Sequence, residues 1–132
     1  MNSEPRQFIV DTFAWVEYFD ATPRGEQAKK IIESEKNELF TSDVCLAEIK
    51  FWLLNDNKDV PPVLSVVLQN STILHSNMDD WLSAAQIKFE KRKNTPNIGL
   101  VDCLTIHHSQ KQNAKILTGD KHFKNEKNAA LI

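Results

Sequence analysis

Short apolar runs recur along this chain, separated by segments with helical spacing. They lie at residues 8–10, 39–41, 72–74 and 115–118, with a last candidate at 129–132, and a polar lead-in covers residues 1–6. Runs this short and this rich in Ile, Leu, Val and Phe are typical of strands covered on both faces. Strands that alternate with helices predict an α/β fold with an open, mostly parallel β-sheet flanked by helices on both faces.

Length and composition are those of one ordinary globular domain, expected to span residues 1–132. No apolar run reaches the ~18 residues that a membrane span needs, and no basic and apolar leader opens the chain. Cys45 and Cys103 have no paired spacing, so neither a zinc site nor a disulfide is indicated. We therefore expect a reducing, cytoplasmic location and no membrane partner. The three glycines are too dispersed for a phosphate-binding loop.

The helix expected over residues 44–54 is the most apolar of the chain. Within it, Glu48 shares a stripe with Val44, Phe51 and Trp52. A carboxylate on an apolar stripe is costly unless it has a partner, which singles out Glu48. A second long helix is expected over residues 78–93, with an apolar face turned inward that consists of Trp81, Leu82, Ala85 and Phe89.

Four carboxylates are expected at one edge of the predicted sheet. Asp11 directly follows the first strand, and Asp120 follows the strand at 115–118 within a Gly-Asp turn. Asp102 opens a helix, and Glu48 lies one turn into another. Because helices that follow parallel strands begin at the carboxyl edge, where ligands of such sheets bind, all four side chains can converge there.

Each of these acids also has a purely structural interpretation. Asp11 and Asp102 could be helix N-caps, Asp120 a turn residue, and Glu48 could extend to water. All four would then have to meet at one edge by accident. No lysine or arginine accompanies them at a fixed short spacing, and bunched carboxylates without a basic partner favour Mg²⁺ or Mn²⁺. Without metal, their mutual repulsion should raise the pKa of at least one.

The motifs around these acids resemble those of PIN-domain ribonucleases, and most closely the VapC-like toxins of VapBC toxin–antitoxin pairs. They follow the family's order over nearly the whole chain: residues 8–19, 41–42, 46–49, 100–102 and 116–123. The resemblance implies a PIN-like three-layer α/β/α fold and Mg²⁺- or Mn²⁺-dependent hydrolysis of phosphodiester bonds in RNA. It also implies a set of catalytic and metal-binding residues, Asp11, Glu48, Asp102 and Asp120, with Thr12 and Thr118 as supporting groups.

In such a site the metal would activate water and offset phosphoryl charge, and one-ion and two-ion versions both stay open. By the same resemblance we expect a homodimer and a small antitoxin protein that covers an apolar groove. Residues 86–132 hold nine of the 16 Lys and Arg residues and four of the 18 acids, so this part could contact RNA, although such an imbalance also suits solvated helix faces. The candidate contacts are residues 88–93, Lys111, Lys115, Lys121 and Lys124.

Two positions depart from the family's usual pattern. Asp43 stands where a small residue or proline is common, and His107 with His108 stands where small residues usually allow close helix packing. Core or surface roles are favoured for the histidines over contacts with substrate.

Other functions fit the sequence less well. A free-standing PIN nuclease in RNA processing and a non-catalytic PIN-like binding module remain alternatives. A phosphatase of the haloacid-dehalogenase type needs a second Asp two residues after Asp11, where Phe13 stands. A receiver-like domain needs paired acids early in the chain, and these are absent.

Overall fold

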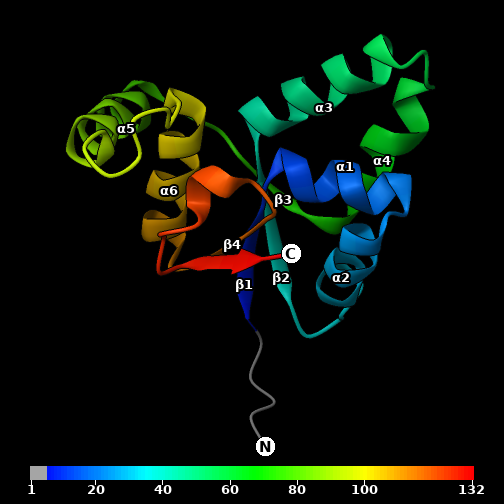
Figure 1. Cartoon of the computed structure of the whole chain (residues 1–132). Coiled ribbons are helices and arrows are strands. Elements are labelled where there is room, and N and C mark those ends of the chain that lie inside the picture. The colour runs from blue at the N-terminus through cyan, green and yellow to red at the C-terminus, as the bar shows by residue number, and fades with distance from the viewer. Residues whose placement is uncertain (1–5) are drawn as a thin grey trace, which may run out of the picture.

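The computed structural model describes residues 6–132, in which strands and helices alternate as expected (Figure 1). The polar lead-in falls mostly on residues 1–5, outside this part. No helix within residues 6–132 is long and apolar enough to span a membrane. The elements in chain order are β1 (Gln7–Val10), α1 (Thr12–Asp20), α2 (Pro23–Ile32), β2 (Glu38–Ser42), α3 (Asp43–Asn55), α4 (Val60–Asn70), β3 (Thr72–Leu74), α5 (Met78–Lys91), α6 (Leu100–Gln112), β4 (Lys115–Thr118), the short 3-10 helix η1 (Lys121–Phe123) and β5 (Ala129–Leu131).

The strands form one parallel sheet in the order β3-β2-β1-β4-β5. β1 is central, and its Ile9 is in register with Phe40 of β2 and Ile116 of β4. Helices α1 to α4 cover one face and α5 and α6 the other (Figure 1). The predicted three-layer α/β/α fold is confirmed.

Successive residues along the central strands pack into separate apolar cores on the two faces of the sheet. Phe8, Val10 and Leu117 pack under α1 to α4, whereas Ile116 packs with α5 and α6. Ile9 forms a smaller cluster with Phe40 and Ala114. Both faces of the central strands are therefore buried, which explains why their sequences read as continuous apolar runs.

The predicted inward face of α5 is correct only at Trp81, which is partly buried against the core that α5 shares with α6, and is wrong at the other three residues. Leu82 and Phe89 are 62% and 60% exposed, and Ala85 is also exposed, while Ala84 and Ile87 are the buried apolar residues. The reason is that α5 packs on α6 and not on the sheet. The side of α5 that carries Ala84 and Ile87 is buried where the two helices pack. The side that carries Leu82 and Phe89 faces solvent.

Polar contacts fix α6 to its neighbours and account for the two histidines. His108 is buried, and its Nε2 lies 2.9 Å from the Ser76 hydroxyl, which donates to Asp43 Oδ1 at 2.8 Å. His107 Nε2 lies 2.7 Å from Asp80 Oδ1 of α5. Asp43 and both histidines therefore hold helices in place, in agreement with the interpretation that the sequence favoured.

The contact between α1 and α2 depends on a glycine. A Cβ atom at Gly25 would overlap the carbonyl group of Glu17. We expect Gly25→Ala to lower the free energy of unfolding by about 2 kcal/mol, although alanine is the better helix former by about 1 kcal/mol. Denaturant unfolding measures the change. Gln27→Ala, at an exposed position of the same helix, should change it by less than about 0.5 kcal/mol. A Gly25→Ala protein as stable as the wild type would contradict this packing.

Candidate active site

The candidate site is a cleft of about 670 Å³ at the carboxyl edge of the sheet. β1 lies at the centre of the strand order, and the chain adds β2 on one side of it and β4 on the other. This is the topological switch point, where open α/β sheets bind ligands. The four acids that the sequence predicts all line this one cleft: Asp11, Glu48, Asp102 and Asp120.

Asp11 occupies the N-cap position of α1, yet its carboxylate makes no cap hydrogen bond. Instead Oδ2 accepts a hydrogen bond from the Thr118 hydroxyl at 2.9 Å. The residue is only 7% exposed, and burial raises its pKa to about 7 against the effect of the Thr118 bond, with smaller contributions from the charges of Asp102 and Glu48. A raised pKa was expected, but burial is its main cause and mutual repulsion is secondary.

Glu48 is exposed to solvent. It is therefore not the costly buried carboxylate that its place on an apolar stripe predicted. Its helix α3 turns Cys45, Ile49 and Leu53 toward the core. The stripe that includes Glu48 instead forms a wall of the cleft, where Phe51 is 70% exposed. The Thr12 hydroxyl donates to Glu48 Oε1 at 2.6 Å and fixes the direction of the carboxylate.

Asp120 has a structural role of the kind that the sequence offered as an alternative, but Asp102 is not an N-cap, because Gly99 holds that position and Asp102 lies in the first turn of α6. Both acids also face the cleft. Asp102 Oδ2 accepts from the Gly99 N–H at 3.0 Å, and Asp120 Oδ1 accepts from the His122 N–H at 2.9 Å. Thr118 supports this side as well, because its hydroxyl accepts from the Asp120 N–H at 3.0 Å. Partial burial raises the pKa of Asp102, opposed by the Gly99 hydrogen bond and increased by the charge of Asp120.

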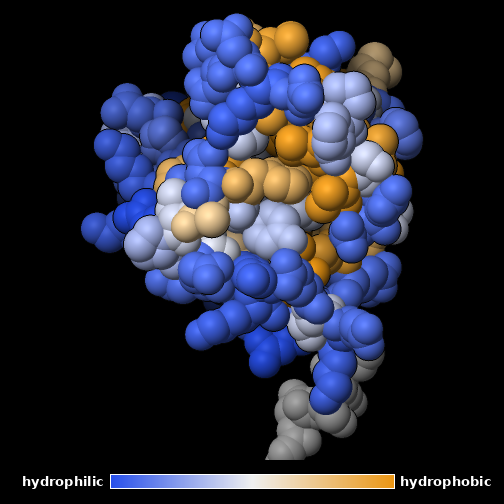
Figure 2. All heavy atoms as spheres, turned by 90° about the vertical axis from the view of Figure 1, so that its right-hand side faces the viewer, coloured by the Kyte–Doolittle hydropathy of each residue, from blue (hydrophilic) through white to orange (hydrophobic). Residues whose placement is uncertain are grey.

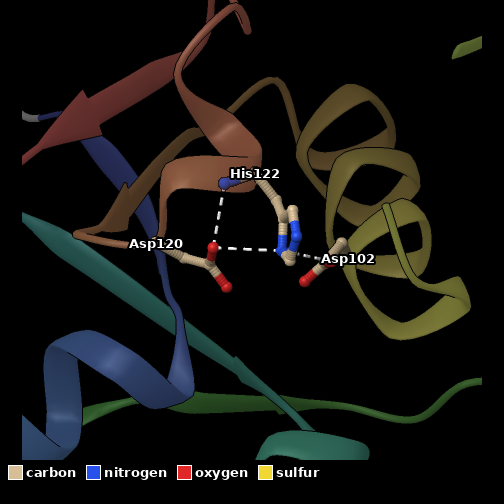
Figure 3. Close-up of side chains that lie close together, drawn as sticks. All are labelled: Asp102, Asp120 and His122. Atoms are coloured by element: carbon tan, nitrogen blue, oxygen red, sulfur yellow. Dashed lines mark hydrogen bonds and ion pairs between the residues drawn. The ribbon is translucent and has the colours of Figure 1, made fainter. Parts of the chain in front are cut away.

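Sequence reasoning missed one residue of the site, His122. Its ring lies between the carboxylates of Asp102 and Asp120, with Nδ1 3.3 Å from Asp102 Oδ2 and 3.1 Å from Asp120 Oδ1 (Figure 3). The expectation from the sequence concerned lysine and arginine, but an imidazole is also a basic partner for a carboxylate. The available signal was the position of the histidine, two residues after Asp120 and just before the buried Phe123.

The geometry brings together carboxylate oxygens and one ring nitrogen on four elements of the chain. Asp102, Asp120 and His122 each offer one ligand atom, and these three atoms all lie within 4.8 Å of one another. Asp11 adds a carboxylate that is almost fully buried. Such a donor set suits a divalent cation, whose charge would stabilise the ionised forms of the acids.

Comparison with protein-family models matches residues 8–127 to the PIN domain. Comparison with curated protein sequences gives no match. Among solved structures, VapC20 from Mycobacterium tuberculosis, described as a toxin that cleaves the sarcin–ricin loop, is similar with a TM-score of 0.72 and 17% identity over 92% of this chain and 96% of that chain.

Two toxin–antitoxin structures have the same fold. VapBC2 from Rickettsia felis, bound to a DNA fragment from its promoter, gives a TM-score of 0.69 and 19% identity over 96% of this chain and 97% of that chain. VapBC-1 from nontypeable Haemophilus influenzae gives 0.67 and 17% over 96% of each chain. Because the family model spans most of the sequence and the fold agrees with it, the chain belongs to the PIN domain family, as its motifs predicted.

Proposed function

We propose that this PIN domain is a divalent-metal-dependent endoribonuclease and the toxin of a toxin–antitoxin pair. The observation that carries the proposal is the meeting of four carboxylates in one cleft at the switch point of the sheet. The family is one of nucleases, and the similar solved structures include a toxin described as cleaving the sarcin–ricin loop.

The residues present fit Mg²⁺ or Mn²⁺. Carboxylate oxygens are the preferred donors of both ions, and a cation would favour the ionised form of the buried Asp11, whose pKa is raised to about 7. We assign Asp11 and Asp102 as direct ligands, and Glu48 and Asp120 as ligands or as groups that position water. When bound, the metal would activate water and offset the charge of the phosphoryl oxygens.

The supporting hydroxyls set the orientation of the acids before any ligand binds. Thr118 holds Asp11, and Thr12 holds Glu48, each through one short hydrogen bond. Gly119 lets the turn before Asp120 lie against the ring of Phe13, because a Cβ atom there would overlap the ring. Because these carboxylates are already oriented, their side chains need little rearrangement during the reaction.

The proposal assigns fewer of the candidate lysines to the RNA backbone than the sequence suggested, because several of them have partners within the chain. Lys88 donates to the Ile98 carbonyl group, Lys91 pairs with Glu126, and Lys111 pairs with Asp80. Lys115 begins β4, at the opposite end of the strand from the acids.

Two exposed lysines in the stretch after Asp120, Lys121 and Lys124, keep their role in the proposal. Arg24 joins them, because its guanidinium lies 5.6 Å from the ring centre of Phe13, which lines the cleft.

An antitoxin partner is supported by an apolar face formed by α1 to α4. Figure 2 shows hydrophobic side chains gathered across this face among hydrophilic ones. Leu54 and Leu68 are more than half exposed, and Phe19, Trp52 and Leu64 are only partly buried. Patches of this kind mark interaction sites, and the similar VapBC structures are toxin–antitoxin complexes.

A homodimer is supported by the outer face of α5. Met78, Leu82, Ala85 and Phe89 are all exposed and follow helical spacing, so they form one apolar stripe along the helix. We propose that a second copy of the chain covers this stripe. Free-standing RNA processing and a non-catalytic module remain the alternatives, and the latter predicts no metal binding at the four acids.

The first prediction concerns activity. The purified protein should cleave single-stranded RNA with Mg²⁺ or Mn²⁺ and stop with EDTA, as followed on labelled RNA in gels. Asp102→Asn should lower the rate by at least about 100-fold, because loss of a mere supporting group at a metal site already costs about 10–100-fold. The exposed Asp79→Asn should leave the rate unchanged. Cleavage that survives both EDTA and Asp102→Asn would rule out the mechanism.

The second prediction concerns stability and pH. The pKa of Asp11 is raised from 3.8 to about 7 in the folded state, so between these pH values the folded protein binds more protons than the unfolded chain. The free energy of unfolding in EDTA should therefore fall from about pH 4 to about pH 7, by on the order of a few kcal/mol. Asp11→Asn should remove this fall and melt at a higher temperature than the wild type at pH 7.

Added Mg²⁺ should stabilise the wild type, by about 2.7 kcal/mol at 100 times its Kd, and should stabilise Asp11→Asn much less. The control is Asp59→Asn at an exposed N-cap of α4, whose side chain also makes no cap hydrogen bond. It should follow the wild type in both EDTA and Mg²⁺. Equal metal shifts in Asp11→Asn and wild type, with no gain of stability in EDTA, would show that Asp11 is only a helix-starting residue.

The third prediction concerns assembly. Leu82→Glu places a charge in the proposed dimer interface and removes an apolar contact of about 2 kcal/mol, so the dimer Kd should rise at least about 10-fold. Analytical ultracentrifugation measures it. Leu68→Glu makes the same change on an exposed leucine of the other layer and should leave the Kd unchanged. A wild-type protein that stays monomeric at high concentration would contradict the dimer.

A further inference from the structure

His122 places a ring nitrogen between two carboxylates of the site. Its ring lies between Asp102, from α6, and Asp120, from the turn after β4 (Figure 3). Nδ1 is buried and is the only such side-chain nitrogen or oxygen in residues 6–132 without a hydrogen-bond partner. Buried polar atoms without a partner are rare in folded proteins, and each calls for an explanation.

The separations around Nδ1 are also those expected between ligands of a shared ion. Although Nδ1 lies 3.1 Å and 3.3 Å from the two carboxylate oxygens, it makes a hydrogen bond with neither. Two neighbouring ligands of a six-coordinate ion with bonds of about 2.1 Å lie about 3 Å apart. The nitrogen therefore lies at ligand spacing from both oxygens, and the three atoms are all within 4.8 Å of one another.

The backbone fixes the ring in this position. The His122 N–H donates to Asp120 Oδ1, so the same carboxylate that flanks the ring also anchors the residue. The next residue, Phe123, is fully buried and packs in the core with α6. The backbone of η1 is thus anchored at His122 and at Phe123, which keeps the imidazole next to the two carboxylates.

We propose that His122 is a nitrogen ligand of the metal centre, alongside Asp102 and Asp120, and that it makes the site prefer Mn²⁺ to Mg²⁺. The inference rests on the proposed function and deepens it. Imidazole nitrogen is a good donor for transition metals, whereas Mg²⁺ strongly prefers oxygen and keeps its water. An all-carboxylate site would lack this source of discrimination.

Calorimetric titration of the metal-free protein with Mn²⁺ and with Mg²⁺ tests the preference. His122→Ala should weaken Mn²⁺ binding by about 10–100-fold and Mg²⁺ binding by less than about 3-fold. His75→Ala, at an exposed histidine before α5, should change neither affinity. Unchanged Mn²⁺ binding in His122→Ala would overturn the proposal. Tighter binding would overturn it too, because His122 would then be a counter-ion that competes with the metal.

Pulsed electron paramagnetic resonance of bound Mn²⁺ gives a test that does not depend on activity. The wild type and His75→Ala should show coupling to a histidine nitrogen, and His122→Gln should lose it while still binding the ion. Absence of nitrogen coupling in the wild type would overturn the inference but leave the nuclease intact. A wild-type protein that binds neither ion would contradict the proposed function itself.

Discussion

The site depends on the parallel pairing of β1 with β4. This pairing joins segments more than 100 residues apart, and the Thr118 hydroxyl bonds to Asp11 across it. The Asp11 N–H also donates to the Leu117 carbonyl group at 3.0 Å, which continues the ladder one residue beyond the strand. The register therefore fixes the position of Asp11 relative to the turn that carries Asp120. A slip of one residue would move every side chain of β1 to the other face of the sheet and separate the two acids.

Burial of Asp11 shows a conflict between stability and function at this edge. A carboxyl group that is 7% exposed, with one hydrogen bond from a side chain, is held more easily in its neutral form. The free energy to hold it there comes from apolar packing on both faces of β1, in which Phe8, Ile9 and Val10 are almost fully buried. A divalent cation at the site would favour the ionised form and reverse the penalty. Metal binding and stability of the native state are then expected to be linked.

The fold could be predicted from the sequence because the central strands are covered on both faces and therefore read as apolar runs. The position of the four acids followed from that fold, since each lies next to a strand end or a helix start. The sequence could not show which element of the fold each helix face packs against. Leu82 and Phe89 look like core residues by spacing alone, but α5 meets α6 and not the sheet. His122 was missed because its approach to Asp102 depends on how η1 packs, which no local pattern records.

The structural and chemical interpretations of the acids turn out to be compatible. A carboxylate has two oxygens with about four lone-pair positions, so one backbone N–H leaves most of its acceptor capacity free. Asp102 uses Oδ2 to hold the Gly99 N–H, and Asp120 uses Oδ1 to hold the His122 N–H. Each bond orients its acid at the start of a helix. It leaves a lone pair on the accepting oxygen, which faces His122 Nδ1, and leaves the second oxygen of that acid uncommitted. Asp11 is the exception, since its carboxylate makes no cap bond and is oriented by Thr118 instead. Capping in this fold is thus a means of positioning the site, and a cap residue at a strand end is no evidence against a ligand role.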